Sequence, residues 1–137
     1  MKRVVSTILL VILLTSMLYS AFKVMPAEAA GTIYIRADGS IDPPTSPISH
    51  AGNVYTLNGN ISSATDANGI VIERDSIILD GSGYTLQASG GSGSGILLDD
   101  RSYVTVRNAK IKGYRNGLGL GGSSNNSIIG NYMANEI

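Results

Sequence analysis

The side chains best suited to chemistry in this sequence are carboxylates that follow short apolar segments. Glu73 follows the segment GIVI, and Asp99 and Asp100 follow the similar segment GILL. Calcium is bound by several oxygen ligands that converge on the ion. Glycoside hydrolysis uses two carboxyl groups at a defined separation. Glu73, Asp99 and Asp100 are therefore a candidate calcium site, or two of them a candidate acid–base pair.

The alternative is that these carboxylates are solvated charges in turns. Arg74 and Arg101 lie beside them in the sequence and would relieve their repulsion. Exposed ion pairs of this kind are common and contribute little free energy. We favour this interpretation, so we expect no catalytic residue and no cofactor in this chain, with calcium as the one option left open.

Other chemistry-bearing residue types are scarce. The chain has no cysteine and one histidine, His50, for which no catalytic partner is evident. A copper site needs imidazole or sulfur ligands, so we predict no copper site and, apart from the calcium option, no metal site. After residue 29 the chain has seven Lys and Arg against nine Asp and Glu, a net charge of −2. It therefore lacks the basic stripe typical of nucleic-acid binding.

Aromatic and basic residues suggest a glycan-binding face. They are Tyr103, Arg107, Lys110, Lys112 and Tyr114. Tyrosine rings stack on sugars, and the nearby cations suit an acidic polysaccharide or cell-envelope glycan. The alternative is that these are ordinary strand residues of a folded domain.

Two short segments match the acceptor pattern for N-glycosylation. They are Asn60-Ile61-Ser62 and Asn125-Asn126-Ser127. Because the pattern is short and often occurs by chance, Asn60 and Asn125 are candidate attachment sites only.

The elements that must position these residues are short strands in a repeat. Segments that begin at Gly69, Gly95 and Gly117 start 26 and then 22 residues apart, and no segment after residue 30 has helical periodicity. A fixed period of this length indicates stacked repeats. Each coil must bend sharply, and glycine adopts backbone angles that other residues reach only at a cost.

Alignment of the repeats places apolar residues in four inward-facing columns, since side chains two residues apart share one face of a strand. The predicted columns are Ile70, Ile96 and Leu118; Ile72, Leu98 and Leu120; Leu79, Val106 and Ile128; and Leu86, Ile111 and Met133. Three short strands per coil predict three parallel sheets. Because Tyr55-Thr56-Leu57 matches Tyr84-Thr85-Leu86 in residue order, we expect it to start the stack.

The chain divides into three segments on this interpretation. Residues 1–29 have a positive start, an apolar run and small residues after Pro26, which predict a signal peptide or, alternatively, an uncleaved membrane anchor. Residues 30–53 contain three prolines and are the predicted N-terminal cap, and residues 54–137 are the coils. We expect a secreted or cell-surface protein that meets the membrane only through its N-terminal segment.

The quoted segments GTIYIRADGSIDPP, YTLNGNI, GIVIERDSIILDGSGYTLQ and SSNNSIIGN resemble the right-handed parallel β-helix proteins with pectin-lyase-like repeats. The resemblance is to the carbohydrate-binding and sugar-hydrolase repeat group and to the NosD-like group, which include archaeal exported surface proteins. It implies an all-β fold, a right-handed single-stranded parallel β-helix of about three coils with an N-terminal cap. The right hand also agrees with the general rule for parallel crossovers.

The resulting functional expectation is an exported surface module with a structural or adhesive role and carbohydrate binding, without a complete catalytic site. The alternative is the N-terminal part of a polysaccharide lyase or glycoside hydrolase whose catalytic coils lie beyond residue 137. No C-terminal cap is evident, so we expect a piece of a longer chain with an open final coil. Because an exposed parallel edge invites pairing, that coil is a candidate site of self-association.

Overall fold

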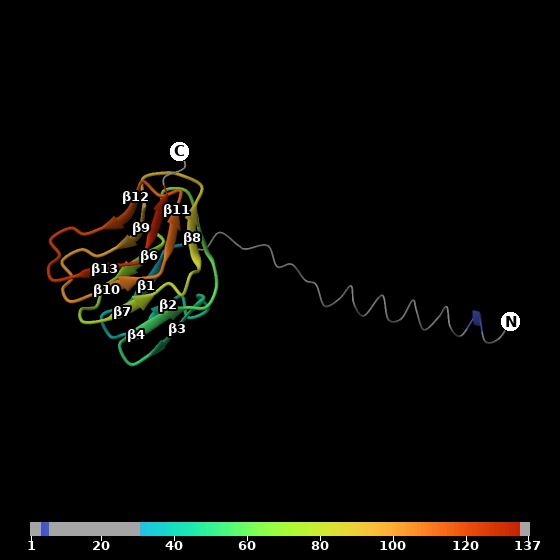
Figure 1. The fold of residues 1–137 in the computed structure, drawn as a ribbon, viewed down its shortest axis with the longest axis horizontal. Helices are drawn as coiled ribbons and strands as arrows, with labels where there is room; N and C mark the ends of the chain where they lie inside the picture. The colour runs from blue at the N-terminus through green and yellow to red at the C-terminus, as the bar shows by residue number, and fades with distance from the viewer. Residues whose placement is uncertain (1–3, 6–30, 135–137) are drawn as a thin grey trace.

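The computed structural model describes residues 4–5 and 31–134, and residues 31–134 form a parallel β-solenoid of about three turns (Figure 1). The prediction of an all-β chain of stacked parallel coils is confirmed. The predicted signal peptide or anchor, residues 1–29, lies outside the described residues except for residues 4–5. Within the described part of the chain, no helix is long and apolar enough to cross a membrane.

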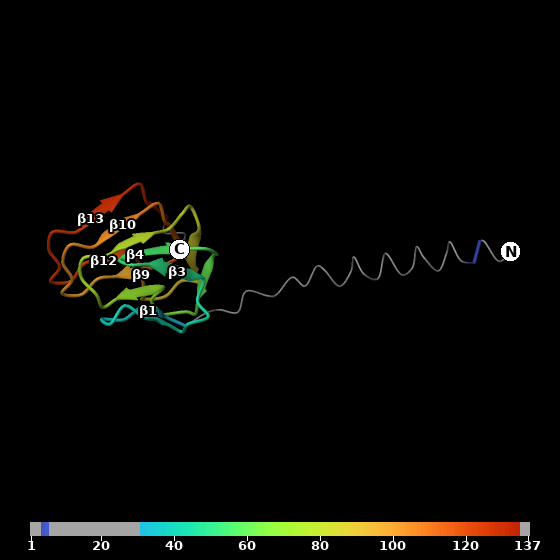
Figure 2. The ribbon, with the colours of Figure 1, turned by 90° about the horizontal axis from the view of Figure 1, so that it is seen from below.

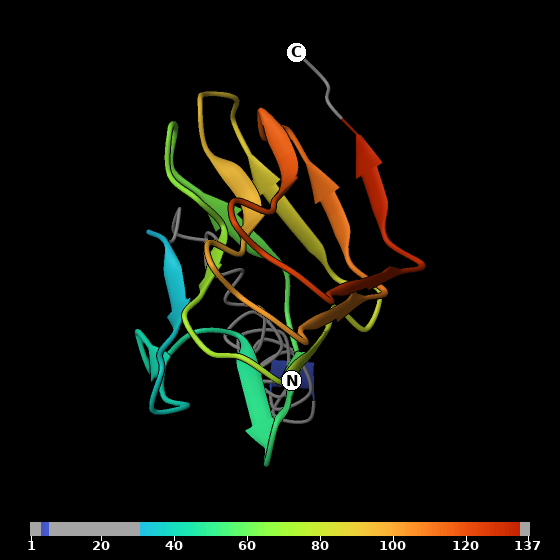
Figure 3. The ribbon, with the colours of Figure 1, turned by 90° about the vertical axis from the view of Figure 1, so that its left-hand side faces the viewer.

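The strands form three sheets that surround one core. The first sheet has the order β12 (Asn116–Gly119), β9 (Ser94–Leu97), β6 (Ile70–Ile72), β1 (Ile33–Ile35), β2 (Ile41–Asp42). The second has the order β13 (Ser127–Ile129), β10 (Thr105–Arg107), β7 (Ile78–Asp80), β4 (Val54–Leu57), β3 (Ile48–Ala51). The third has the order β14 (Tyr132–Ala134), β11 (Lys110–Lys112), β8 (Thr85–Ala88), β5 (Ile61–Ser63). In Figure 2 and Figure 3 the ribbon colours follow one another along the stack, from cyan to red.

The predicted columns match the strand register. Ile96 pairs with Ile70 on one side and Leu118 on the other. Val106 lies between Leu79 and Ile128, and Ile111 between Leu86 and Met133. The structure extends the columns into an earlier coil through Ile33, Ile35, Tyr55 and Ile61. These ladders of buried apolar side chains are the core, and their burial is the main stabilising contribution.

Tyr55-Thr56-Leu57 belongs to the first coil of the stack, but its place in the coil differs from that of Tyr84-Thr85-Leu86. Tyr55 pairs with Leu79 in the second sheet, whereas Leu86 pairs with Ile61 in the third. Tyr55 lies within β4 and is buried, whereas Tyr84 lies in the bend just before β8 and is exposed. Similar residue order therefore did not mean an equivalent place in the coil.

The N-terminal end of the stack is covered by antiparallel strands. β1 pairs in parallel with β6 and antiparallel with β2. β4 likewise pairs in parallel with β7 and antiparallel with β3. His50 of β3 stacks on the Tyr55 ring with the centroids 5.1 Å apart, so it packs against the end of the core. The predicted cap segment thus contains one strand of the solenoid, β1, together with the two strands that cover its end.

One bend has the same backbone conformation in three successive coils. Ser76, Tyr103 and Asn125 stack there with φ of 57°, 58° and 54°. This left-handed geometry is uncommon for residues other than glycine, and asparagine adopts it most readily. Tyr103 therefore occupies a conformationally demanding bend, with its side chain mostly exposed.

Candidate functional site

The outer face of the third sheet gathers polar side chains in two columns. The register of the strands aligns Asn60, Thr85, Lys110 and Tyr132 in one column, and Ser62, Gln87 and Lys112, followed by the apolar Ala134, in the other. Side chains alternate along each strand, so the intervening Ile61, Leu86 and Ile111 face the core. The same alternation that builds the core thus produces a continuous polar face.

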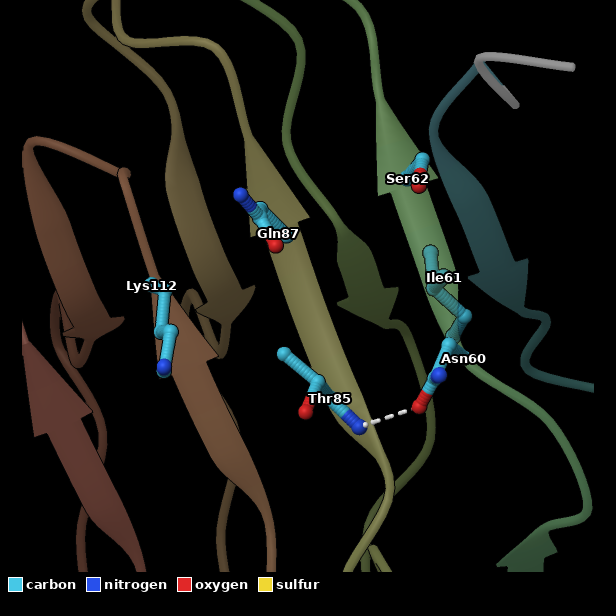
Figure 4. Close-up of a pocket in the computed structure, with 6 residues that line it drawn as sticks. All are labelled: Asn60, Ile61, Ser62, Thr85, Gln87 and Lys112. Atoms are coloured by element: carbon cyan, nitrogen blue, oxygen red, sulfur yellow. Dashed lines mark hydrogen bonds between the residues drawn. The ribbon is translucent and has the colours of Figure 1, made fainter. Parts of the chain in front are cut away.

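This face is hollowed into a shallow groove of about 290 Å³ (Figure 4). Its lining comes from the three neighbouring strands β5, β8 and β11 and the residue before β5: Asn60, Ile61, Ser62, Thr85, Gln87 and Lys112. At its edge the Asn60 Oδ1 accepts a hydrogen bond of 2.9 Å from the Thr85 backbone N–H. This contact joins two successive coils and fixes the Asn60 side chain at the rim of the groove.

The groove has hydroxyl, amide and ammonium groups but no carboxylate. None of the residues in β5, β8, β11 and β14 is acidic. Lys110 is exposed, and the half-buried Lys112 has its Nζ 6.0 Å from the centroid of the Tyr132 ring. That distance lies at the limit of a cation–π contact. The face can therefore donate charge-assisted hydrogen bonds to an anion and ordinary ones to hydroxyl groups.

The predicted glycan-binding residues do not all lie on this face. Lys110 and Lys112 do, and they are adjacent to Tyr132, which the sequence analysis did not select. Arg107 belongs to the second sheet, where its Nε donates a hydrogen bond of 2.8 Å to Asp80 Oδ2. Tyr103 lies in the bend before β10. Tyr132 could have been found from the sequence, because it aligns with Lys110 in the repeat.

The prediction that Tyr114 faces outward is wrong. Its ring is 2% exposed, and its hydroxyl shares a hydrogen bond of 2.7 Å with Ser63 Oγ. Burial raises the pKa of this phenol, with the Ser63 hydrogen bond acting in the opposite direction. Tyr114 is a core residue, and its hydrogen bond joins the segment after β11 to Ser63 in β5.

The glycines that begin the repeats make room for this ring. A Cβ at Gly69 would lie 2.8 Å from the Tyr114 hydroxyl, and one at Gly95 would lie 2.3 Å from Cγ2 of Ile111. Neither glycine has a left-handed φ. The expectation that glycine serves the bends is therefore wrong for this column, where close packing requires the absence of a side chain.

The acidic candidates do not form a cluster. Glu73 accepts a hydrogen bond of 3.2 Å from Arg36 Nη1, and Arg36 also pairs with Asp42. Asp99 and Asp100 lie in the bend after β9, next to the backbone of the following coil. No group of three or more His, Cys, Asp or Glu side chains within residues 31–134 is placed to hold a metal ion.

Asp80, in contrast, is more than a solvated turn charge. It accepts hydrogen bonds from the Ser82 backbone N–H at 2.9 Å, from Arg107 and from Asn108. Burial opposes ionisation of Asp80, but these hydrogen bonds outweigh it and hold the pKa below its usual value. The side chain is a coil-to-coil connection on the second sheet.

The two candidate glycosylation sites differ in their surroundings. Asn60 lines the groove, so a sugar attached there would occupy it. Asn125 is exposed in the left-handed bend, away from the third sheet. The neighbouring Asn126 bonds to the preceding coil through both ends of its amide, which leaves Asn125 as the residue that faces solvent.

Fold and face together define this chain as a parallel β-solenoid with one polar, lysine-bearing outer sheet. Comparison with protein-family models, with curated proteins and with solved structures gave no match to the chain.

Proposed function

We propose that this chain is an exported surface module that binds an acidic polysaccharide along the outer face of its third sheet. The observation that supports this function is the groove between β5 and β11, which has hydroxyl and amide groups, Lys112 and no acidic residue. The segment 1–29 supplies the expected route of export, and the work of the module is structural or adhesive.

The chemistry of the face fits a polymer of hydroxylated, negatively charged units. Lys110 and Lys112 are two residues apart on one strand, so their Cα atoms are separated by about 7 Å. Each ammonium group can pair with a carboxylate, and such charge-assisted hydrogen bonds are roughly twice as strong as neutral ones. Thr85, Gln87 and Ser62 offer partners for sugar hydroxyls, and the Tyr132 ring lies beside the cations.

The resemblance to the pectin-lyase-like repeats is part of the same proposal. Coils of 22 and 26 residues with three short strands each support it. We infer a right-handed winding on the same grounds, since parallel crossovers are right-handed almost without exception.

The test measures binding of the exported chain to polygalacturonate and alginate, with dextran as the neutral polymer. The double variant Lys110→Gln and Lys112→Gln should weaken binding to the acidic polymers about tenfold, as the loss of about 1.4 kcal/mol would. Arg74→Gln is the control, because it removes a half-buried cation outside the third sheet. Binding that is absent, or that falls equally in the control, would show that the third sheet is not a glycan site.

A further inference from the structure

Three asparagines in this sequence are followed directly by glycine: Asn58, Asn68 and Asn116. The Asn-Gly sequence is chemically reactive, because the backbone nitrogen of the glycine can attack the side-chain carbonyl of the asparagine and no glycine side chain hinders the approach. The attack needs a glycine N–H that is not held by an acceptor, and it needs the asparagine backbone to rotate. The three dipeptides therefore differ in reactivity according to where the fold places them.

The dipeptide Asn68-Gly69 is held by the next coil. Asn68 Oδ1 accepts a hydrogen bond of 2.8 Å from the Ser94 backbone N–H, and the Gly69 N–H donates one of 2.9 Å to the Ser94 carbonyl. Gly69 is also buried. Both reacting groups are thus already bonded, so the attack would require the two coils to separate locally.

The dipeptide Asn116-Gly117 lies within β12, where Asn116 pairs with Ser94 of β9. The reaction closes a five-membered ring, and closure requires a rotation about the Cα–C bond of the asparagine, away from the extended conformation of a strand. The pairing with β9 opposes this rotation. This dipeptide is therefore restrained by its backbone.

The dipeptide Asn58-Gly59 lies in the connection between β4 and β5 and has neither restraint. The Asn58 side chain is exposed. Within residues 31–134, no hydrogen bond involves the Asn58 side-chain amide or the Gly59 N–H. The Asn58 backbone N–H donates a hydrogen bond of 3.0 Å to the Pro47 carbonyl, which anchors the residue but occupies neither reacting group.

We propose that Asn58 is a site of spontaneous deamidation. The Gly59 nitrogen forms a bond to Asn58 Cγ, and the bond between Cγ and Nδ2 breaks. Nδ2 leaves as ammonia with the proton that the Gly59 nitrogen loses, which leaves a five-membered succinimide. Water then adds to one of the two ring carbonyls and opens the ring, giving aspartate or isoaspartate. Water is the one co-reactant, and nothing is oxidised or reduced.

The modification changes both charge and backbone at the entry to the third sheet. Either product adds one negative charge two residues before Asn60, which lines the groove. Isoaspartate also adds one methylene group to the backbone between β4 and β5. The proposal does not rest on glycan binding, because the reaction needs only this chain and water.

The test incubates the purified, folded chain in mildly alkaline buffer and follows deamidation by mass spectrometry of tryptic peptides. Asn58 and Asn68 lie in one peptide, since no Lys or Arg occurs between Arg36 and Arg74. We expect conversion at residue 58 to be at least about tenfold faster than at residue 68, the ratio that an opening cost of about 1.4 kcal/mol gives. Equal rates, or faster conversion at residue 68, would overturn the proposal.

Incubation in urea separates the effect of the fold from that of the local sequence. In the unfolded chain the two dipeptides have the same reacting groups, so their rates should become similar. A difference that persists in urea would assign the slow conversion of Asn68 to its sequence neighbours and contradict the argument from structure.

The variant Asn58→Gln provides a second check on the folded chain. Its longer side chain would have to close a six-membered ring, so conversion at residue 58 should be abolished while conversion at residue 68 stays unchanged. The side chain is exposed, so the fold should tolerate the change. Ammonia release that is the same in this variant and in the unaltered chain would place the reactive residue elsewhere and also overturn the proposal.

Discussion

The penultimate coil, residues 94–112, and the terminal coil, residues 116–134, have the same three-strand plan and different environments. Val106 is 0% exposed, and Ile128, its partner in the same column, is 38% exposed. The larger isoleucine is thus the less buried of the two. Burial in this solenoid depends on a neighbouring coil on each side more than on the residue type in the column.

The two coils also differ in how they are held. The penultimate coil bonds to both neighbours through strand pairing, and its Arg107 reaches back to Asp80. The terminal coil has Ile129 at the position of Arg107 and is attached through asparagines that bond backward. In a stack of this kind each repeat contacts only its neighbours, so within residues 31–134 the coil of residues 116–134 has fewer stabilising contacts than the coil before it.

The largest expected effect is in the shared column of Val106 and Ile128. Val106→Asp places a charge at a fully buried position and should reduce the free energy of unfolding by more than about 4 kcal/mol. Ile128→Asp, at a position that is 38% exposed in this structure, should reduce it by less than about 1 kcal/mol. Urea unfolding followed by circular dichroism measures both. Similar losses would mean that the two coils are equally covered and that the comparison fails.

An intermediate effect is expected from the asparagines that attach the terminal coil. Asn131 accepts a hydrogen bond of 2.9 Å from the Ala109 N–H and donates one of 2.8 Å to the Val106 carbonyl. Asn131→Ala leaves both backbone groups without this partner and should cost about 2 kcal/mol. The control is Asn125→Gly, since glycine readily adopts the left-handed φ of that bend and the change should be close to neutral. Comparable losses in the two variants would remove the distinction between bonding and bend asparagines.

The smallest effect is expected at Asp80, which connects covered coils and has no equivalent in the terminal one. Because its folded pKa lies below the unfolded value of 3.8, its contribution is present above that pH and is lost as the pH falls through the folded pKa. At pH 7 Asp80→Asn should lower the free energy of unfolding by about 1 kcal/mol. The difference from the unaltered chain should then shrink as the pH is lowered below 3.8. A difference that is independent of pH would assign the effect to packing instead of to charge.

The core columns could be predicted from the sequence because each column repeats one kind of side chain at one interval. Ile70, Ile96 and Leu118 illustrate this, since their glycine-preceded segments align without gaps. The third-sheet lysines could be predicted as outward for the same reason, because Ile111 between them faces the core. The alignment also places Tyr132 beside Lys110. Its neighbours in the sequence are uncharged, so the sequence analysis did not select it.

The direction in which a side chain points was harder to predict at and near the bends between strands. Tyr114 follows β11 by two residues, and its ring turns inward because Gly69 and Gly95 leave space for it. Tyr55-Thr56-Leu57 resembles Tyr84-Thr85-Leu86 in sequence and lies in a different sheet. In each case the position depended on the bend between two strands, where alternation no longer determines which way a side chain points.

The sequence alone determined the period, the columns and the alternation of core and surface, because these follow from side-chain spacing along extended strands. Tertiary structure decided which outward residues share a face, since that depends on which strands lie side by side. It also decided that Asp80 is held by Arg107 from the next coil and that Asn131 bonds to the Val106 carbonyl of the coil before it. These are contacts between residues more than twenty positions apart, and only the stacking of whole coils brings them together.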